Sequence, residues 1–270
     1  MLSSYTTTDG TVLLYVTTRD GVSIFGHSGE PRDLVLPAEI NGVPVAAVEE
    51  SAFRGSATLR SITIPEGVTT IGFYAFEGAA NLERVAAPSS LRYVGGRAFV
   101  GCAKLRELTF PADLETVRED VFRGASLDLR ETFSACRRFA AVALGDLPGS
   151  LGDACLWYEF DPQNADAPIT IGGYAGDPEK IALPASIAGR AVAAIGRSAF
   201  WGADNLRAAT LPETAELVDE FAFFRCPALE SVRLPNSLRR IGDFAFCHCP
   251  RLATPTPGDS VSVGFAAFRP

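Results

Sequence analysis

The chain has 270 residues, of which 47% are hydrophobic and 21% are charged, a balance typical of a globular rather than a disordered protein. Its formal net charge of −8 argues against nucleic acid and anionic membrane surfaces as partners, because both attract basic patches. No run of about 18 apolar residues occurs, so no membrane-spanning helix is predicted. The length allows either one long repeat array or two modules.

The first predicted element is a β-hairpin over residues 11–28. Val12, Leu14 and Val16 alternate with polar residues, Asp20-Gly21 supplies a turn, and the alternation then resumes. We expect this hairpin to cover the open first coil of a repeat array. The first residues do not have the pattern of a signal peptide. Whether the protein is cytoplasmic or had an export signal removed stays open.

Residues 34–125 repeat one phrase, best seen as LRSITIPEGVTTIGFYAF at 59–76. Its prolines recur every 23 residues at Pro65, Pro88 and Pro111, after a longer first repeat of 28 from Pro37. A fixed period in the low twenties is the signature of a solenoid, and the range of leucine-rich repeat lengths includes it. Its Ala-Phe step keeps the same spacing and predicts a column of core phenylalanines: Phe53, Phe76, Phe99 and Phe122.

Each coil can be divided by physical role. Leu59, Ile62 and Ile64 read as inward-facing strand residues, and Pro65 ends the strand because it has no N–H for a ladder. Gly72 is interpreted as permitting a bend. Ala75-Phe76 is predicted to lie on a short helical turn, so the fold class is an α/β repeat solenoid of short parallel strands and short helical turns.

A helical cap is predicted for residues 126–147, with the helix spanning about 129–144 and broken by Pro148-Gly149-Ser150. The second half then repeats the first at an offset of 147. A hairpin-like opening spans 156–175, and repeats span about 181–270, again with one interval of 28 followed by 23. The chain is therefore interpreted as two tandem modules, 1–147 and 148–270, each opened by a hairpin.

The phrase L-x-x-I-x-I-P-x-x-V-x-x-I-G-x-x-A-F-x-x-C, carried at 105–122, 206–223 and 229–249, resembles the BspA-type leucine-rich repeat. The resemblance covers residues 34–268 apart from 126–168. It implies a protein–protein interaction module, and a secreted or surface adhesion protein of a bacterium. A cytoplasmic scaffold or assembly subunit without catalytic activity is the alternative. The partner expected is a protein of unknown identity, and the oligomeric state stays open.

Strand positions between the inward residues are predicted to face outward and to bind a protein ligand. The alternative is that their charges pair between coils and only keep the sheet soluble. The candidates are Arg60, Thr63, Glu83, Arg84, Arg106 and Glu107 in the first array and Arg207, Glu230 and Arg233 in the second.

A second candidate surface is aromatic. Trp201, Phe221, Phe224 and Phe244 flank the Ala-Phe steps of the second array and would mark an interface if exposed. The alternative is packing against the junction or the other module.

The cysteines read as core residues rather than as a metal site. Cys226 and Cys249 would stack on adjacent coils, either as thiols or as a disulfide, whereas Cys136 and Cys155 lie in the junction. Cys247-His248-Cys249 lacks the spacing of a zinc site. No metal or cofactor is expected. With two histidines and no catalytic motif in the sequence, we expect no enzyme activity and assign no catalytic residue.

Overall fold

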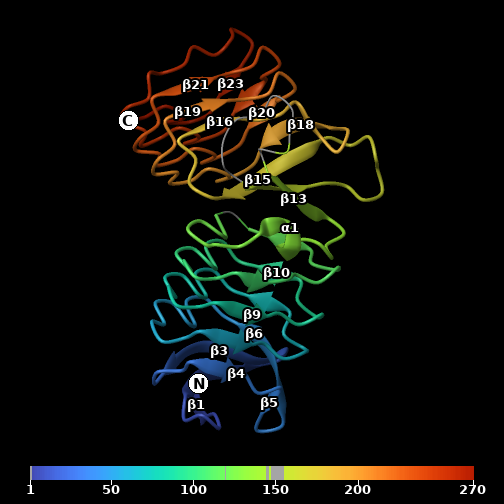
Figure 1. The fold of residues 1–270 in the computed structure, drawn as a ribbon, viewed down its shortest axis with the longest axis vertical. Coiled ribbons are helices and arrows are strands. Elements are labelled where there is room, and N and C mark those ends of the chain that lie inside the picture. Colours follow the sequence, from blue (N-terminus) through green and yellow to red (C-terminus); the bar gives the residue numbers. More distant parts are fainter. Residues whose placement is uncertain (1, 119, 144–145, 147–154) are drawn as a thin grey trace. The chain divides into compact units, whose positions relative to one another are not determined.

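The computed structural model describes residues 2–118, 120–143, 146 and 155–270. The chain divides into two compact units, Met1–Arg137 and Arg138–Pro270. Each unit is a β-solenoid whose successive coils stack on one another (Figure 1). The predicted boundary between 147 and 148, and the Pro148-Gly149-Ser150 break, lie outside the described residues.

The larger sheet of the first unit begins antiparallel and continues parallel. The hairpin predicted over 11–28 is present as its second and third strands, and the parallel strands follow in steps of one coil. In spatial order the strands are β1 (Ser3–Thr6), β2 (Val12–Thr18), β3 (Gly21–Ser28), β6 (Val43–Val48), β8 (Thr70–Ile71), β10 (Tyr93–Val94) and β12 (Thr116–Val117), with β5 (Glu39–Ile40) paired to β6.

The smaller sheet of the first unit holds the strands that the repeat phrase predicts. Its four parallel strands are β4 (Asp33–Val35), β7 (Ser61–Thr63), β9 (Arg84–Ala86) and β11 (Glu107–Leu108). Ser61 pairs with Arg84, 23 residues later, so the sequence period equals the register of the sheet. Outward side chains at equivalent positions therefore form straight columns along this sheet, which we call the strand face of the unit.

The second unit repeats this plan. Its larger sheet contains β13 (Phe139–Ala143), β14 (Cys155–Glu159), β15 (Ile169–Ala175), β18 (Arg190–Ile195), β20 (Leu217–Val218), β22 (Arg240–Ile241) and β23 (Ser262–Val263), with β17 (Ser186–Ile187) paired to β18. Its strand face is built by β16 (Lys180–Ala182), β19 (Ala208–Thr210) and β21 (Ser231–Arg233), all parallel.

The predicted short helical turns at the Ala-Phe steps are wrong. The Phe53 N–H donates to the Ala75 carbonyl at 2.7 Å, and the Phe76 N–H donates to the Ala98 carbonyl at 2.9 Å. These N–H groups bond to the next coil, so they cannot make the i to i−4 bonds of an α-helix. The residue before each Ala-Phe step turns the chain with a positive φ, as at Tyr74 (58°). Each unit is therefore a β-solenoid rather than an α/β one.

The predicted helix over about 129–144 is also wrong. The only α-helix among the described residues is α1 (Leu129–Thr132), which Asp128 caps by accepting the Arg130 N–H. Residues 139–143 instead form β13, which pairs antiparallel with β14 and opens the second unit. Strand pairing satisfies their backbone groups and buries Phe139, so it overrides the local helical pattern.

A phenylalanine column fills the core of each unit. Phe53, Phe76, Phe99 and Phe122 stack with centroid distances of 5.4–6.1 Å and interplanar angles of 3–6°. His27 covers the first ring at 4.9 Å. In the second unit the column is Phe200, Phe223, Phe246 and Phe268, and Tyr174, which is 147 residues after His27, covers its first ring at 5.2 Å. The two units thus share one design for closing the core.

The glycines before the Ala-Phe steps permit close stacking of coils, and the interpretation of Gly72 as a bend was wrong. A Cβ on Gly72 would lie 2.6 Å from the backbone of Glu49, and a Cβ on Gly95 would lie 2.4 Å from the Phe73 nitrogen. Neither glycine has a positive φ, so their role is to avoid steric overlap with the preceding coil.

We expect Gly95→Ala to lower the free energy of unfolding by about 1–3 kcal/mol, because the added methyl group must push two hydrogen-bonded coils apart. Urea denaturation followed by far-UV circular dichroism measures this loss. Gly26→Ala is the matched control, since its Cβ would come no closer than 3.6 Å to another side chain. Equal midpoints for the two variants would contradict the steric role of Gly95.

Candidate functional site

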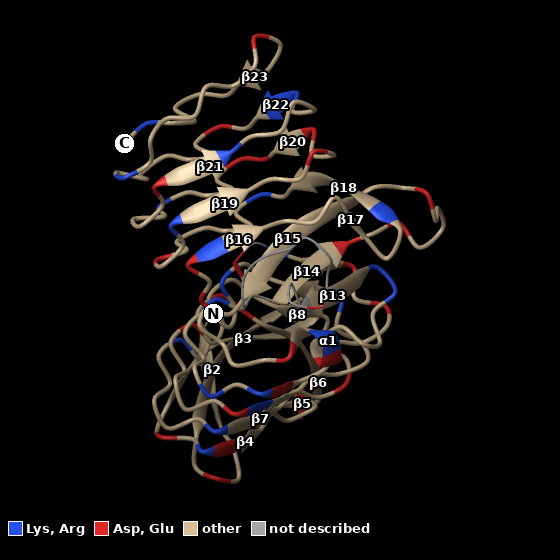
Figure 2. Cartoon of the chain, turned by 45° about the horizontal axis from the view of Figure 1, so that its top comes forward, with Lys and Arg blue, Asp and Glu red and all other residues tan. Residues whose placement is uncertain are grey.

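The nine candidate binding residues lie on the strand faces of the two units. Eight of the nine side chains are exposed, and Glu83 is half-buried. The intervening Ile62, Val85 and Val232 point inward and are buried, as strand alternation requires. The two faces therefore present regular columns of polar side chains on a rigid sheet, and Figure 2 shows charges of both signs at the starts of β16, β19 and β21.

Most of these charges pair between neighbouring coils. Arg84 contacts Glu107 at 2.5 Å, and Arg106 contacts Glu83 at 2.6 Å. The hydrogen bond from Arg84 lowers the pKa of the Glu107 carboxyl, and this ion pair in turn raises the pKa of Arg84. Pairing in the second unit is looser, with Arg207 and Glu230 3.8 Å apart and Arg233 3.4 Å from Glu213.

Arg60 and Thr63 differ from the other seven candidates. Arg60 makes no ion pair with any residue that the structure describes. The side chains of Arg60 and Thr63 also make no hydrogen bond to any of these residues. The charge-pairing alternative therefore accounts for the other seven candidates. Because surface ion pairs contribute little to stability, pairing does not prevent these side chains from exchanging partners.

Two shallow depressions indent the strand face of the first unit. One of about 380 Å³ is lined by Arg84, Arg106 and Glu107 beside the start of α1. The other, of about 310 Å³, is lined by Arg60 and Glu83 together with Arg32, Asn81 and Lys104. The sequence analysis missed Arg32. The 28-residue first repeat was a usable signal, because Arg32 stands 28 residues before Arg60.

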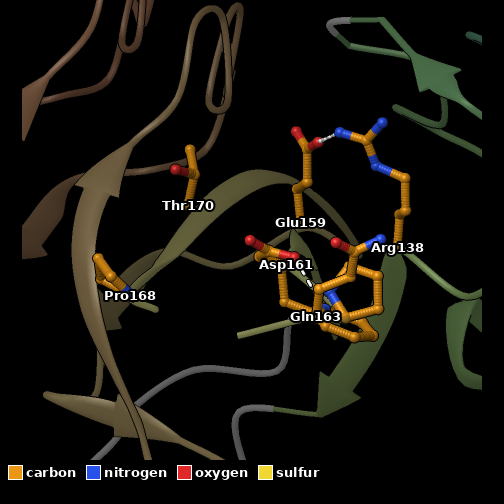
Figure 3. Close-up of a pocket in the computed structure, with 8 residues that line it drawn as sticks. Arg138, Glu159, Asp161, Gln163, Pro168 and Thr170 are labelled. Carbon is orange, nitrogen blue, oxygen red and sulfur yellow. Dashed lines mark hydrogen bonds and ion pairs between the residues drawn. The ribbon is translucent and has the colours of Figure 1, made fainter. Parts of the chain in front are cut away.

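A depression of about 470 Å³ lies in the second unit, next to the loop between β14 and β15 (Figure 3). Arg138 and Glu159 on its wall pair at 2.6 Å, and Asp161 accepts the Gln163 N–H. Arg190 holds the loop by donating to the carbonyls of Asp161 and Asn164. Several polar groups here thus serve to fix the loop.

The aromatic candidates form one cluster on the second unit. The ring centroid of Trp201 lies 4.6 Å from that of Phe224 and 5.6 Å from that of Phe221. The Phe221 ring stacks on Phe244 with a centroid distance of 5.2 Å. Each of these four side chains is half-buried. Phe265 continues the row against Phe244 and is 69% exposed. The aromatic rings therefore bury one another in part and leave an apolar surface at the end of the row.

The cysteines are thiols. All six are free, and Cys226 and Cys249 donate to the carbonyls of Phe200 and Phe223 at 3.1 Å. Burial raises the pKa of Cys102 to about 12. Burial also raises the pKa of Cys226, whereas the neighbouring Cys226 thiol lowers the pKa of Cys249. Cys136 and Cys155 are half-buried.

The described residues contain no group of three or more His, Cys, Asp or Glu side chains able to hold a metal ion. His27 contacts the Ala52 carbonyl at 3.0 Å and Ser56 Oγ at 3.2 Å, but Ser56 is buried and the imidazole stacks on Phe53. His27 and Ser56 therefore cover the first ring of the phenylalanine column. Among the residues that the structure describes, there is no apolar helix of membrane-spanning length.

Comparison with known proteins agrees with the repeat pattern. A family profile described as the BspA type leucine rich repeat region matches residues 33–144 and 179–269 in six copies. No curated protein matches the chain.

Several solved structures match most of this chain. A T. pallidum leucine rich repeat protein shares 25% identity, with 93% of this chain and 87% of that protein covered and a TM-score of 0.43. A Bacteroides ovatus leucine-rich repeat protein shares 20%, covering 93% and 59%, with a TM-score of 0.46. The pneumococcal vaccine antigen PcpA shares 16%, covering 99% and 86%, with a TM-score of 0.46.

Proposed function

Because the chain belongs to the BspA-type leucine-rich repeat family, we propose that it is a protein-binding module that uses the strand faces of two tandem arrays. The observation that carries this proposal is the regular outward display of polar side chains on a stacked sheet. Solenoids commonly bind partners on such extended surfaces. The family resemblance further favours a secreted or cell-surface adhesion protein of a bacterium.

Binding is favoured over catalysis by the chemistry of the described residues. His27 is committed to the core, and His248 packs edge-on against Phe224. The carboxylates of the strand faces are exposed or half-buried and mostly paired with arginines. A flat surface of exchangeable ion pairs suits recognition of another protein surface more than the desolvated pocket of an enzyme.

We expect a photo-cross-linking amino acid at Thr63 to capture a protein partner in native cells. Replacing Arg60, Arg84 and Arg106 together with Gln is expected to lower the cross-linking yield about tenfold, equivalent to 1.4 kcal/mol of binding. The same cross-linker at Arg19, which is exposed on the opening hairpin, is the control. Cross-linking at Thr63 that the triple substitution does not change would rule out the strand face of the first unit.

The scaffold alternative has its own test on the aromatic cluster. If the protein self-assembles through this surface, Trp201→Ser with Phe224→Ser should abolish a dimer seen by sedimentation velocity. Phe73→Ser, an exposed aromatic substitution in the first unit, is the control. Cell fractionation separates the two functions, because adhesion requires the protein outside the cell and an internal scaffold requires it inside.

A further inference from the structure

Two arginines lie side by side at the first coil boundary of the strand face. Asp33 on β4 pairs in register with Ser61 on β7, so the residues just before them, Arg32 and Arg60, are neighbours. The Arg60 N–H donates to the Arg32 carbonyl at 2.7 Å, and both side chains are exposed. Stacked strands are about 4.8 Å apart. Like charges on directly opposed strand positions repel each other.

No described carboxylate neutralises these two guanidinium groups. The next residue in the column, Glu83, pairs with Arg106 at 2.6 Å, and Asp33 accepts a hydrogen bond from Ser61 at 2.6 Å. Neither Arg32 nor Arg60 makes an ion pair or a side-chain hydrogen bond within the described residues. Lys104 adds a third cation to the same 310 Å³ depression. We call Arg32, Arg60 and Lys104 the cationic corner.

The second unit shows that the fold does not need this charge pattern. There the equivalent neighbours are Glu179 and Arg207, and the Arg207 N–H donates to the Glu179 carbonyl at the same 2.7 Å. Arg207 also lies 3.8 Å from Glu230 on the other side. At one backbone position the chain therefore carries Glu in one unit and Arg in the other, so stacking of the coils does not explain Arg32.

We propose that the cationic corner binds a carboxylate side chain of an acidic segment in a protein partner. A carboxylate placed between guanidinium groups on adjacent coils can accept hydrogen bonds from both, and the planar fork of arginine matches its geometry. Binding would also relieve the repulsion between Arg32 and Arg60. This inference rests on the proposed function, because it assigns a partner chemistry to the strand face of the first unit.

The lining favours a carboxylate over a phosphate group. Glu83 borders the same depression and disfavours a dianion. The Asn81 amide is used on both sides, since Nδ2 donates to the Ala57 carbonyl at 2.7 Å and Oδ1 accepts from Lys104 at 2.8 Å. The second N–H of Nδ2 is the one neutral donor of this amide that remains beside the cations. The overall charge of −8 opposes an acidic partner at long range, so we expect weak, salt-sensitive binding.

The test is fluorescence anisotropy of the full chain with a fluorescein-labelled Gly-Ser peptide that contains one Glu-Asp-Glu segment. Arg32→Glu, which installs the residue found at position 179, should weaken binding at low salt at least tenfold. Arg19→Glu makes the same charge change on the exposed hairpin and should alter binding less than twofold. The reciprocal Glu179→Arg should create a second site and raise the stoichiometry towards two peptides per chain.

Three outcomes would overturn the proposal. The first is equal binding by the Arg32→Glu and Arg19→Glu variants. The second is equal binding of a Gln-Asn-Gln peptide, and the third is tighter Arg32-dependent binding of inorganic phosphate or a phosphoserine peptide. Cross-linking of a protein partner from Thr63 is an independent measurement. If this cross-linking persists while the acidic peptide does not bind, the proposal for the cationic corner is wrong and the strand face still binds protein. If both fail, the strand-face proposal fails too.

Discussion

Phe76→Ala is expected to lower the free energy of unfolding by about 3–5 kcal/mol, the usual loss for a buried phenylalanine. The Phe76 ring is fully buried and stacks on Phe53 at 5.5 Å and on Phe99 at 5.4 Å. Its removal leaves a cavity in the middle of the column. The flanking coils cannot close this cavity, because backbone hydrogen bonds to both neighbours fix their spacing.

The measurement is urea denaturation followed by far-UV circular dichroism, because Trp157 and Trp201 both belong to the second unit and would not report on the first. Phe73→Ala is the matched control, since Phe73 is three residues away and 36% exposed. We expect its effect to be below about 1 kcal/mol. A Phe76→Ala midpoint equal to that of the control would show that the column does not hold the array together.

The sequence predicted the phenylalanine column and the strand faces because both depend on burial, which residue spacing records directly. A 23-residue period fixes which side chains stack, and alternation within Leu59–Ile64 fixes which point inward. The in-register pairing of Ser61 with Arg84 follows from the same period. The offset of 147 likewise predicted a second array with its own opening hairpin.

The two wrong helix predictions concern the hydrogen-bond partners of backbone groups, which residue spacing does not determine. Ala75-Phe76 lies in a turn in which the Phe76 N–H donates to the Ala98 carbonyl of the neighbouring coil, and nothing local to the sequence distinguishes this turn from a helical one. Residues 139–143 are compatible with either a helix or a strand, and pairing with β14 decides between them. In both places tertiary hydrogen bonding overrode the local pattern.

For the candidate site, the sequence predicted outward-facing residues but not their partners. Whether Arg84 reaches Glu107 depends on side-chain rotamers, whereas its place in a column depends only on the repeat. Arg32 was missed because the predicted columns began at Arg60, although the 28-residue first repeat places Arg32 in register with it. That Arg32 and Arg60 lie side by side without an ion pair among the described residues follows only from the side-chain positions in the structure.

A buried ionic network beside the phenylalanine column leads to the second large prediction. Glu77 pairs with Arg54 at 2.8 Å and with Arg97 at 2.6 Å, and its side chain is only 10% exposed. Tyr74 lies between these two arginines, with each guanidinium 5.5 Å from the ring centre. The carboxylate is thus the shared anion of two cations that also cover an aromatic ring.

We expect Glu77→Ala to lower the free energy of unfolding by about 3 kcal/mol. Removing one partner of a buried ion pair costs about 3–5 kcal/mol, and the partial exposure of Arg54 and Arg97 places this case at the lower end. The same denaturation assay measures the change. Glu83→Ala, which breaks a more exposed pair on the strand face, should cost less than about 1 kcal/mol.

The second unit supplies the decisive variant. The positions equivalent to Arg54, Glu77 and Arg97 at the offset of 147 are Trp201, Phe224 and Phe244. All three rings pack on Phe221, which is the counterpart of Tyr74, and none of them carries a charge. Well-packed hydrophobic residues can replace a buried ionic network without loss of stability. The triple variant Arg54→Trp, Glu77→Phe and Arg97→Phe should therefore recover most of what Glu77→Ala loses. If the triple variant is as unstable as Glu77→Ala, hydrophobic packing cannot replace the ionic network, and the network itself is required for the coil geometry of the first unit.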